Sequence, residues 1–160
     1  MNITKHYTMK RILYCIAIIL GVVIALSSCQ KKIEKEYNWA YPVAGDWKLK
    51  AYIDGDEIYG PFEIKIYNTS FGQDSVWIDD YNGNFWDMKF KAKVDMSTLT
   101  FQTAGSVNAI PGYDITIKVT DGKIINKDSI YFNMEFEDDP GTIYTLAGHR
   151  AVGYDDYMQD

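Results

Sequence analysis

The chain has 160 residues, of which 47% are hydrophobic and 15% aromatic, and it carries a net charge of −6. An acidic surface repels the phosphate backbone of nucleic acids, so we expect no nucleic-acid partner. Both cysteines lie within the first 29 residues, so the rest of the chain has no disulfide and must be held together by its apolar core.

The N-terminal segment has the order of an export signal. Lys5, Lys10 and Arg11 precede an uncharged apolar run over residues 12–26. This run is shorter than the ~20 residues that a membrane-spanning helix needs, which favours cleavage over permanent insertion. We predict a signal peptide over residues 1–28, and its removal leaves 13 basic and 22 acidic residues, a net charge of −9.

A cysteine directly follows the small residues that end this signal. The Leu-Ser-Ser-Cys sequence ending at Cys29 resembles the lipobox of bacterial lipoproteins, and this resemblance implies that Cys29 is acylated. Two or three acyl chains anchor a protein to a membrane. Lys31 and Lys32 follow the cysteine, where surface-exported lipoproteins tend to carry acidic residues, so the resemblance implies the periplasmic face of the outer membrane. An unmodified cysteine that ends an ordinary secretory signal is the alternative.

After the cysteine the sequence changes character twice. Residues 29–44 show no sustained alternation, and we interpret them as the lipidated cysteine and a tether with aromatic residues that can dock on the next domain. Apolar and polar residues then alternate in short segments bounded by Gly, Pro, Asn and Asp, which is typical of strands and turns. We place a β-barrel domain over residues 45–154 and a C-terminal tail over residues 155–160.

The alternation predicts strands separated by tight turns. Turn residues stand at Asp54-Gly55, Asn82-Gly83, Asp121-Gly122 and residues 138–141, so adjacent strands should pair antiparallel. Because no helical segment is predicted to cover their apolar faces, the strands must close into a barrel or form a sandwich, and we favour an up-and-down barrel of about eight strands. The predicted strands cover residues 47–53, 62–67, 75–80, 86–94, 99–103, 115–119, 123–126, 130–136 and 142–152.

The two ends of this domain carry a pair of matching motifs. Gly45-Asp46-Trp47 and Gly148-His149-Arg150 resemble the lipocalin and wider calycin pattern, in which an arginine of the last strand covers a tryptophan of the first. A guanidinium over an indole forms a cation–π pair of about 0.5–2 kcal/mol. We therefore expect Trp47 and Arg150 to close one end of the barrel, and we assign His149 to the same closure in preference to catalysis.

A second resemblance covers nearly the whole mature chain. At residues 41–47, 67–69, 76–80, 85–89 and 148–150 the chain is similar to the Bacteroidetes lipoproteins described as lipid-binding putative hydrolases. This resemblance implies a calycin-like barrel with an apolar ligand and supplies no motif-defined catalytic residue.

Rings and thioethers make the predicted interior suitable for an apolar ligand, because such side chains form adaptable pockets. The alternative is that they only fill the core. The candidate ligand-binding residues are Trp86, Met88, Phe90, Phe132, Met134 and Phe136.

Polar candidates are few. Asp79, Asp80 and Asp87 flank one predicted turn and can form a hydrolytic carboxylate pair, although turn-flanking aspartates are more often turn formers. Trp77 and the outward tyrosines form either a carbohydrate-stacking face or ordinary strand surface. No zinc-binding spacing or phosphate-binding glycine loop occurs, so we expect neither a metal nor a cofactor.

These observations favour a monomeric, membrane-anchored lipoprotein whose barrel binds a small apolar or amphipathic, lipid-like ligand. The alternatives are a hydrolase that uses the aspartates, and a structural accessory subunit of an outer-membrane complex.

Overall fold

A computed structural model describes residues 14, 16, 38–70 and 72–151. The chain divides into two compact units, Met1–Glu36 and Tyr37–Asp160. In the first unit the described residues, Tyr14 and Ile16, are helical. The predicted signal peptide otherwise lies outside the described residues, as do Cys29 and the first part of the tether. Within the described part of the chain, no helix has the length and apolarity that crossing a bilayer requires.

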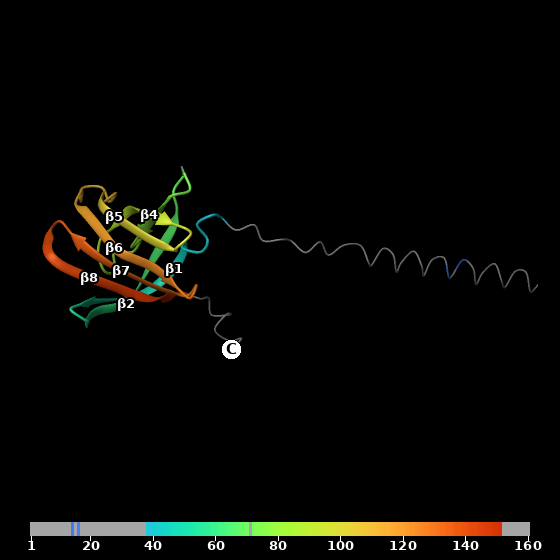
Figure 1. Ribbon diagram of the computed structural model, residues 1–160, viewed down its shortest axis with the longest axis horizontal. Helices are drawn as coiled ribbons and strands as arrows, with labels where there is room; N and C mark the ends of the chain where they lie inside the picture. The colour runs from blue at the N-terminus through green and yellow to red at the C-terminus, as the bar shows by residue number, and fades with distance from the viewer. Residues whose placement is uncertain (1–13, 15, 17–37, 71, 152–160) are drawn as a thin grey trace, which may run out of the picture. The chain divides into compact units, whose positions relative to one another are not determined.

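The second unit is a closed antiparallel β-barrel, which confirms the predicted fold (Figure 1). Each strand pairs with the next along the chain, and the last strand pairs with the first. The strands are β1 Gly45–Ile53, β2 Asp56–Asn68, β3 Ser75–Asp79, β4 Lys89–Asp95, β5 Thr100–Val107, β6 Thr116–Ile125, β7 Ser129–Phe136 and β8 Asp139–Arg150.

Alternation along each strand separates the core from the outer surface. In β7 every second residue from Ile130 to Phe136 is buried, and the residues between them are half-buried. Successive side chains of a strand point to opposite faces, so the apolar set of every strand converges on one interior. This interior is the hydrophobic core of the domain.

Three of the four predicted turns differ in the structure. Asp121-Gly122 lies inside a continuous β6, where it forms a bulge against β7. The reason is steric, because a Cβ at position 122 would overlap the carbonyl oxygen of Phe101, so the glycine lets two strands approach closely. Asn82-Gly83 is part of a longer loop over residues 80–88.

The turn predicted at residues 138–141 is also shifted. Glu137 and Asp138 make the turn, and Asp139, Pro140 and Gly141 already belong to β8. The start of β8 pairs with β7, whereas pairing with β1 begins only at Thr145, so Pro140 lies in a part of β8 that has a free edge. By contrast, Asp54-Gly55 forms the predicted two-residue turn, with φ angles of 52° and 92°.

The segment before β1 covers one end of the barrel. Ala40 and Val43 are fully buried, and the carbonyl oxygen of Val43 accepts a 3.1 Å hydrogen bond from the indole N–H of Trp47. The Arg150 guanidinium lies 4.3 Å from the centre of the Trp47 ring and donates to the carbonyl oxygens of Pro42 and Ala44. This end is therefore closed by packing, a cation–π contact and hydrogen bonds together.

Candidate functional site

The residues predicted to bind a ligand fall into two groups. Phe90, Phe132, Met134 and Phe136 point into the barrel and are at most 1% exposed, because neighbouring side chains cover them. Met88 is buried just before β4, whereas Trp86 is half-buried. The prediction that the strand extends back to Trp86 is wrong, since β4 begins at Lys89.

The loop over residues 80–88, here called the lid loop, crosses the barrel end opposite Trp47. Asp80, which is 3% exposed, holds the lid loop in its conformation. The Asp80 carboxylate accepts the backbone N–H of Asn84 at 3.0 Å, of Phe85 at 2.7 Å and of Trp86 at 3.1 Å. Its own N–H donates to the Met88 carbonyl oxygen at 2.9 Å. One buried side chain thus replaces the strand pairing that the loop lacks.

Two rings of this loop, Phe85 and Trp86, form the lid itself. Trp86 stacks on Phe136 with centroids 4.1 Å apart and planes 9° apart. Phe85 stacks on Phe62 at 4.9 Å, and the Tyr144 ring meets it edge-on at 5.6 Å. Both lid rings are only half-buried, so this end is closed by an aromatic layer that solvent partly reaches.

A second loop holds the lid in place. The indole N–H of Trp86 donates to the Tyr113 hydroxyl at 2.9 Å, and that hydroxyl donates to the Asp138 carboxylate. Burial, and then the Asp138 contact, raises the pKa of Tyr113 above its ordinary value. The loop between β5 and β6 therefore latches the lid to the β7–β8 turn.

Tyr144, beneath the lid, makes folding sensitive to high pH. Burial and a 2.5 Å hydrogen bond to Asp139 raise the pKa of Tyr144 to about 12. An unfolded tyrosine titrates near pH ~10, so between about pH 10 and about pH 12 the unfolded chain loses a proton that the folded chain keeps. The stability that this difference contributes is complete below about pH 10 and is lost as the pH rises to about 12. In urea unfolding, we expect the free energy of unfolding of Tyr144→Phe to fall less over this pH range than that of wild type. Tyr131→Phe, on the outer face of β7, should behave as wild type.

The Trp47 end carries a surface hollow of about 510 Å³. Tyr41, Pro42, Met96 and Leu99 give it an apolar wall, and Lys127 and Arg150 add positive charge. It is a second place where the described residues can accept an apolar chain.

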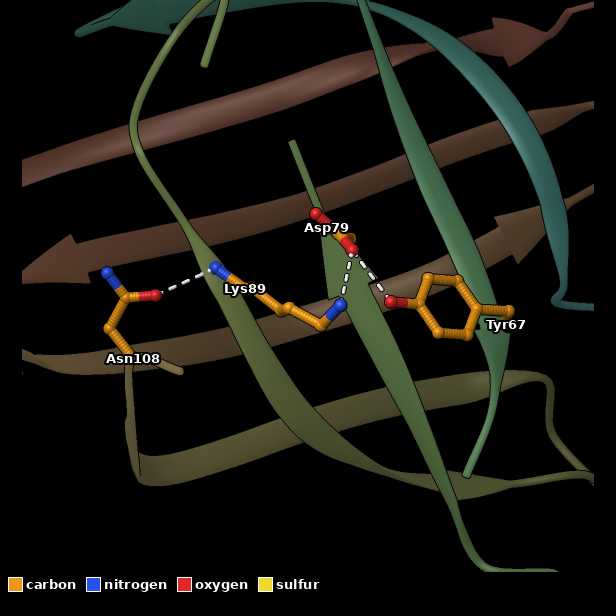
Figure 2. Close-up of polar contacts among 4 residues, drawn as sticks. All are labelled: Tyr67, Asp79, Lys89 and Asn108. Carbon is orange, nitrogen blue, oxygen red and sulfur yellow. Dashed lines mark hydrogen bonds and ion pairs between the residues drawn. The ribbon is translucent and has the colours of Figure 1, made fainter. Parts of the chain in front are cut away.

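A polar cluster lies on the outer face of β2, β3 and β4 (Figure 2). One oxygen of Asp79 accepts the Tyr67 hydroxyl at 2.6 Å and pairs with the Lys89 ammonium at 3.0 Å. The Lys89 backbone N–H donates to the Asn108 side-chain oxygen at 2.8 Å. Burial, and then the Asp79 hydrogen bond, raises the pKa of Tyr67, while hydrogen bonds to Tyr67 and Asp79 raise that of Lys89. We did not predict these partners, because they depend on strand register.

The three aspartates proposed as a hydrolytic group have separate roles. Asp79 holds the outer cluster, Asp80 organises the lid loop and Asp87 is exposed. No hydrogen bond joins any two of them within the described residues. His149 pairs with Lys48 of β1 where the barrel closes, and its side chain is exposed on the outer face. In the described part of the chain, no group of three potential metal ligands is assembled. Hydrolysis by these aspartates stays a prediction, for an ester and glycoside screen of Asp79→Ala.

Comparison with known proteins agrees with this architecture. Residues 32–155 match the family described as lipid-binding putative hydrolase. A search of the curated proteins found no match. The barrel and the family together support a lipid-binding role. With 124 of its 160 residues matched, the chain belongs to the lipid-binding putative hydrolase family.

Proposed function

We propose that this chain is a lipoprotein, anchored through acylated Cys29 at the periplasmic face of the outer membrane, whose barrel binds one amphipathic lipid-like ligand by its acyl chain beneath the lid rings. The anchor is testable separately. A labelled fatty acid should be incorporated into the wild-type chain in cells and not into Cys29→Ala.

The observation that carries the ligand site is the construction of the lid. Phe85 and Trp86 are placed by a loop, over an interior formed by apolar side chains. These side chains already cover one another, so a guest must displace the lid rings. Each ring pair contributes about 0.5–1.5 kcal/mol and the Tyr113 hydrogen bond about 1 kcal/mol, so opening the lid costs a few kcal/mol. Burying an acyl chain contributes about 0.8 kcal/mol per methylene, so roughly five methylenes offset that cost.

Fatty-acid binding by the full chain in a mild detergent tests this site. We expect native mass spectrometry to detect one bound stearate. Tyr113→Phe removes the partner of the Trp86 indole, which makes the open lid more populated, so its apparent affinity should rise about fivefold. Tyr131→Phe, which removes an outer hydroxyl bonded to Asn133, is the matched control and should leave the affinity unchanged.

Fluorescence locates the ligand, because bromine quenches nearby indoles. Dibrominated stearate should quench wild type and Trp47→Phe alike, and the quenching should be lost in Trp86→Phe. Loss of quenching in Trp47→Phe instead would place the lipid in the hollow beside Met96 and Leu99. Absence of stearate uptake in every variant would contradict a lipid site in either place.

A further inference from the structure

The outer face of β2, β3 and β4 concentrates positive charge around one tryptophan. Strand register places Lys65, Asp79 and Lys89 in one row across the three strands. Tyr67, Trp77 and Lys91 form the next row, and Ser75 and Lys93 follow. All these side chains point away from the core, because the alternate residues of the same strands are buried. We call Lys65, Lys89, Lys91 and Lys93 the basic patch.

Three of the four lysines of the basic patch form no ion pair with a described residue. Lys89 pairs with Asp79, the buried anchor of the cluster. Among the described residues, no carboxylate lies within 4.0 Å of the ammonium groups of Lys65, Lys91 or Lys93. The chain as a whole carries a net charge of −6, so this local excess of positive charge opposes the overall balance. Such a patch attracts an anionic ligand short enough to stay on it, whereas a long polyanion such as a nucleic acid meets the acidic remainder of the surface.

A hollow of about 300 Å³ adjoins the basic patch, and the side chains of its wall indicate which kind of anion it can bind. Its wall combines the Trp77 ring and the Lys91 ammonium with hydroxyl side chains, those of Thr69, Ser70 and Ser75. Lys91 lies 4.8 Å from the centre of the half-buried Trp77 ring. An exposed cation–π contact contributes only about 0.5–1 kcal/mol, so Lys91 can leave the ring for an anionic partner at little cost.

We propose that this hollow binds an acidic saccharide. A pyranose ring offers a flat apolar face to Trp77, and its carboxylate or other anionic substituent meets Lys91 and Lys93. Thr69 already donates to the Ser75 carbonyl oxygen and Ser75 to the Asp74 carboxylate, so the sugar hydroxyl groups act as donors to these side-chain oxygens. The Asp79 contacts to Tyr67 and Lys89 brace the neighbouring row of the sheet, so the binding face is rigid on that side. This site lies outside the barrel, so it does not depend on the lipid ligand beneath the lid.

Calorimetric titration of the full chain in mild detergent tests the proposal, with tetragalacturonate as the probe. We expect saturable binding that weakens with added salt. Trp77→Ala should lower the affinity about tenfold, which matches the loss of one ring contact. Lys91→Gln should lower it about threefold, as expected for an exposed ion pair. Lys48→Gln, an exposed lysine on the outer face of β1, is the matched control and should bind as wild type.

Two further probes test separately whether binding requires the carboxylates and whether it requires the sugar. Fully methyl-esterified tetragalacturonate should bind much more weakly, and inorganic phosphate should not compete at equal concentration. The proposal is overturned if tetragalacturonate does not bind, if its ester binds equally well, or if Lys48→Gln weakens binding as much as Lys91→Gln. Stearate uptake measured on Trp77→Ala should equal that of wild type, which shows that the variant is folded and that the two sites are independent.

Discussion

Asp80→Asn is expected to lower the free energy of unfolding by about 3 kcal/mol and to release the lid loop, because hydrogen bonds to a charged group contribute about 1.5–3 kcal/mol each. The wild-type carboxylate accepts three backbone N–H groups, two of them on one oxygen. An asparagine side chain keeps a single acceptor and turns an NH₂ group toward the remaining donors. Phe85 and Trp86 then lose the backbone contacts that aim their rings at the core.

Chemical unfolding and hydrogen exchange measure this effect. Exchange should accelerate at the amides of residues 84–86 well before the strands open, and stearate should bind faster than to wild type. Asp87→Asn is the matched control, since its exposed carboxylate accepts no hydrogen bond from a described residue. Equal stability of the two variants would show that the Asp80 contacts do not hold the lid.

Gly148→Ala is expected to destabilise the barrel by about 3 kcal/mol or more, at the upper end of what overpacking costs. Gly148 lies opposite Leu49 of β1 and Ile130 of β7, where the barrel closes on itself. A Cβ at position 148 would overlap the Lys48 carbonyl oxygen and lie 2.9 Å from Leu49 Cα. These are backbone atoms of a paired strand, so relief requires β1 and β8 to separate.

Another strand glycine is the control for this substitution. At Gly105 of β5, an added Cβ would meet only the methyl carbon of the Thr116 side chain, at 3.1 Å, and that side chain can move. We therefore expect Gly105→Ala to change the free energy of unfolding by less than about 1 kcal/mol. Thermal unfolding of both variants measures the difference, and a mild effect at position 148 would contradict the tight β1–β8 closure.

Local patterns were enough to predict the fold. Strand alternation, as in Ile130, Phe132, Met134 and Phe136, assigns each side chain to a face because the period of a strand is two residues. The Asp54-Gly55 turn could also be predicted from the sequence, because it requires positive φ angles and these residue types tolerate them. Closure into a barrel follows when several such strands have no helix to cover them.

Contacts between segments that are far apart in the sequence could not be predicted in this way. Asn108 bridges the start of β4 and the end of β5, donating to the Asp87 carbonyl oxygen and accepting from Lys89, and no motif marks it. Tyr113 meets Trp86 only because two loops meet at one end of the barrel. The Asp121-Gly122 pair matches a turn locally and becomes a bulge because Phe101 of the adjacent strand lies against it.

By itself the sequence determined which face of each strand is apolar, that the strands form a meander, and which residues resemble a lipoprotein signal. Only the tertiary structure decided how the aspartates divide their roles, that loop rings close the barrel end opposite Trp47, and that Trp77 lies among lysines. The physical reason is that these features depend on interactions of different range along the chain. The face of a side chain depends on its immediate neighbours in the chain, whereas a site depends on register and loop packing, which are settled only when the whole barrel closes.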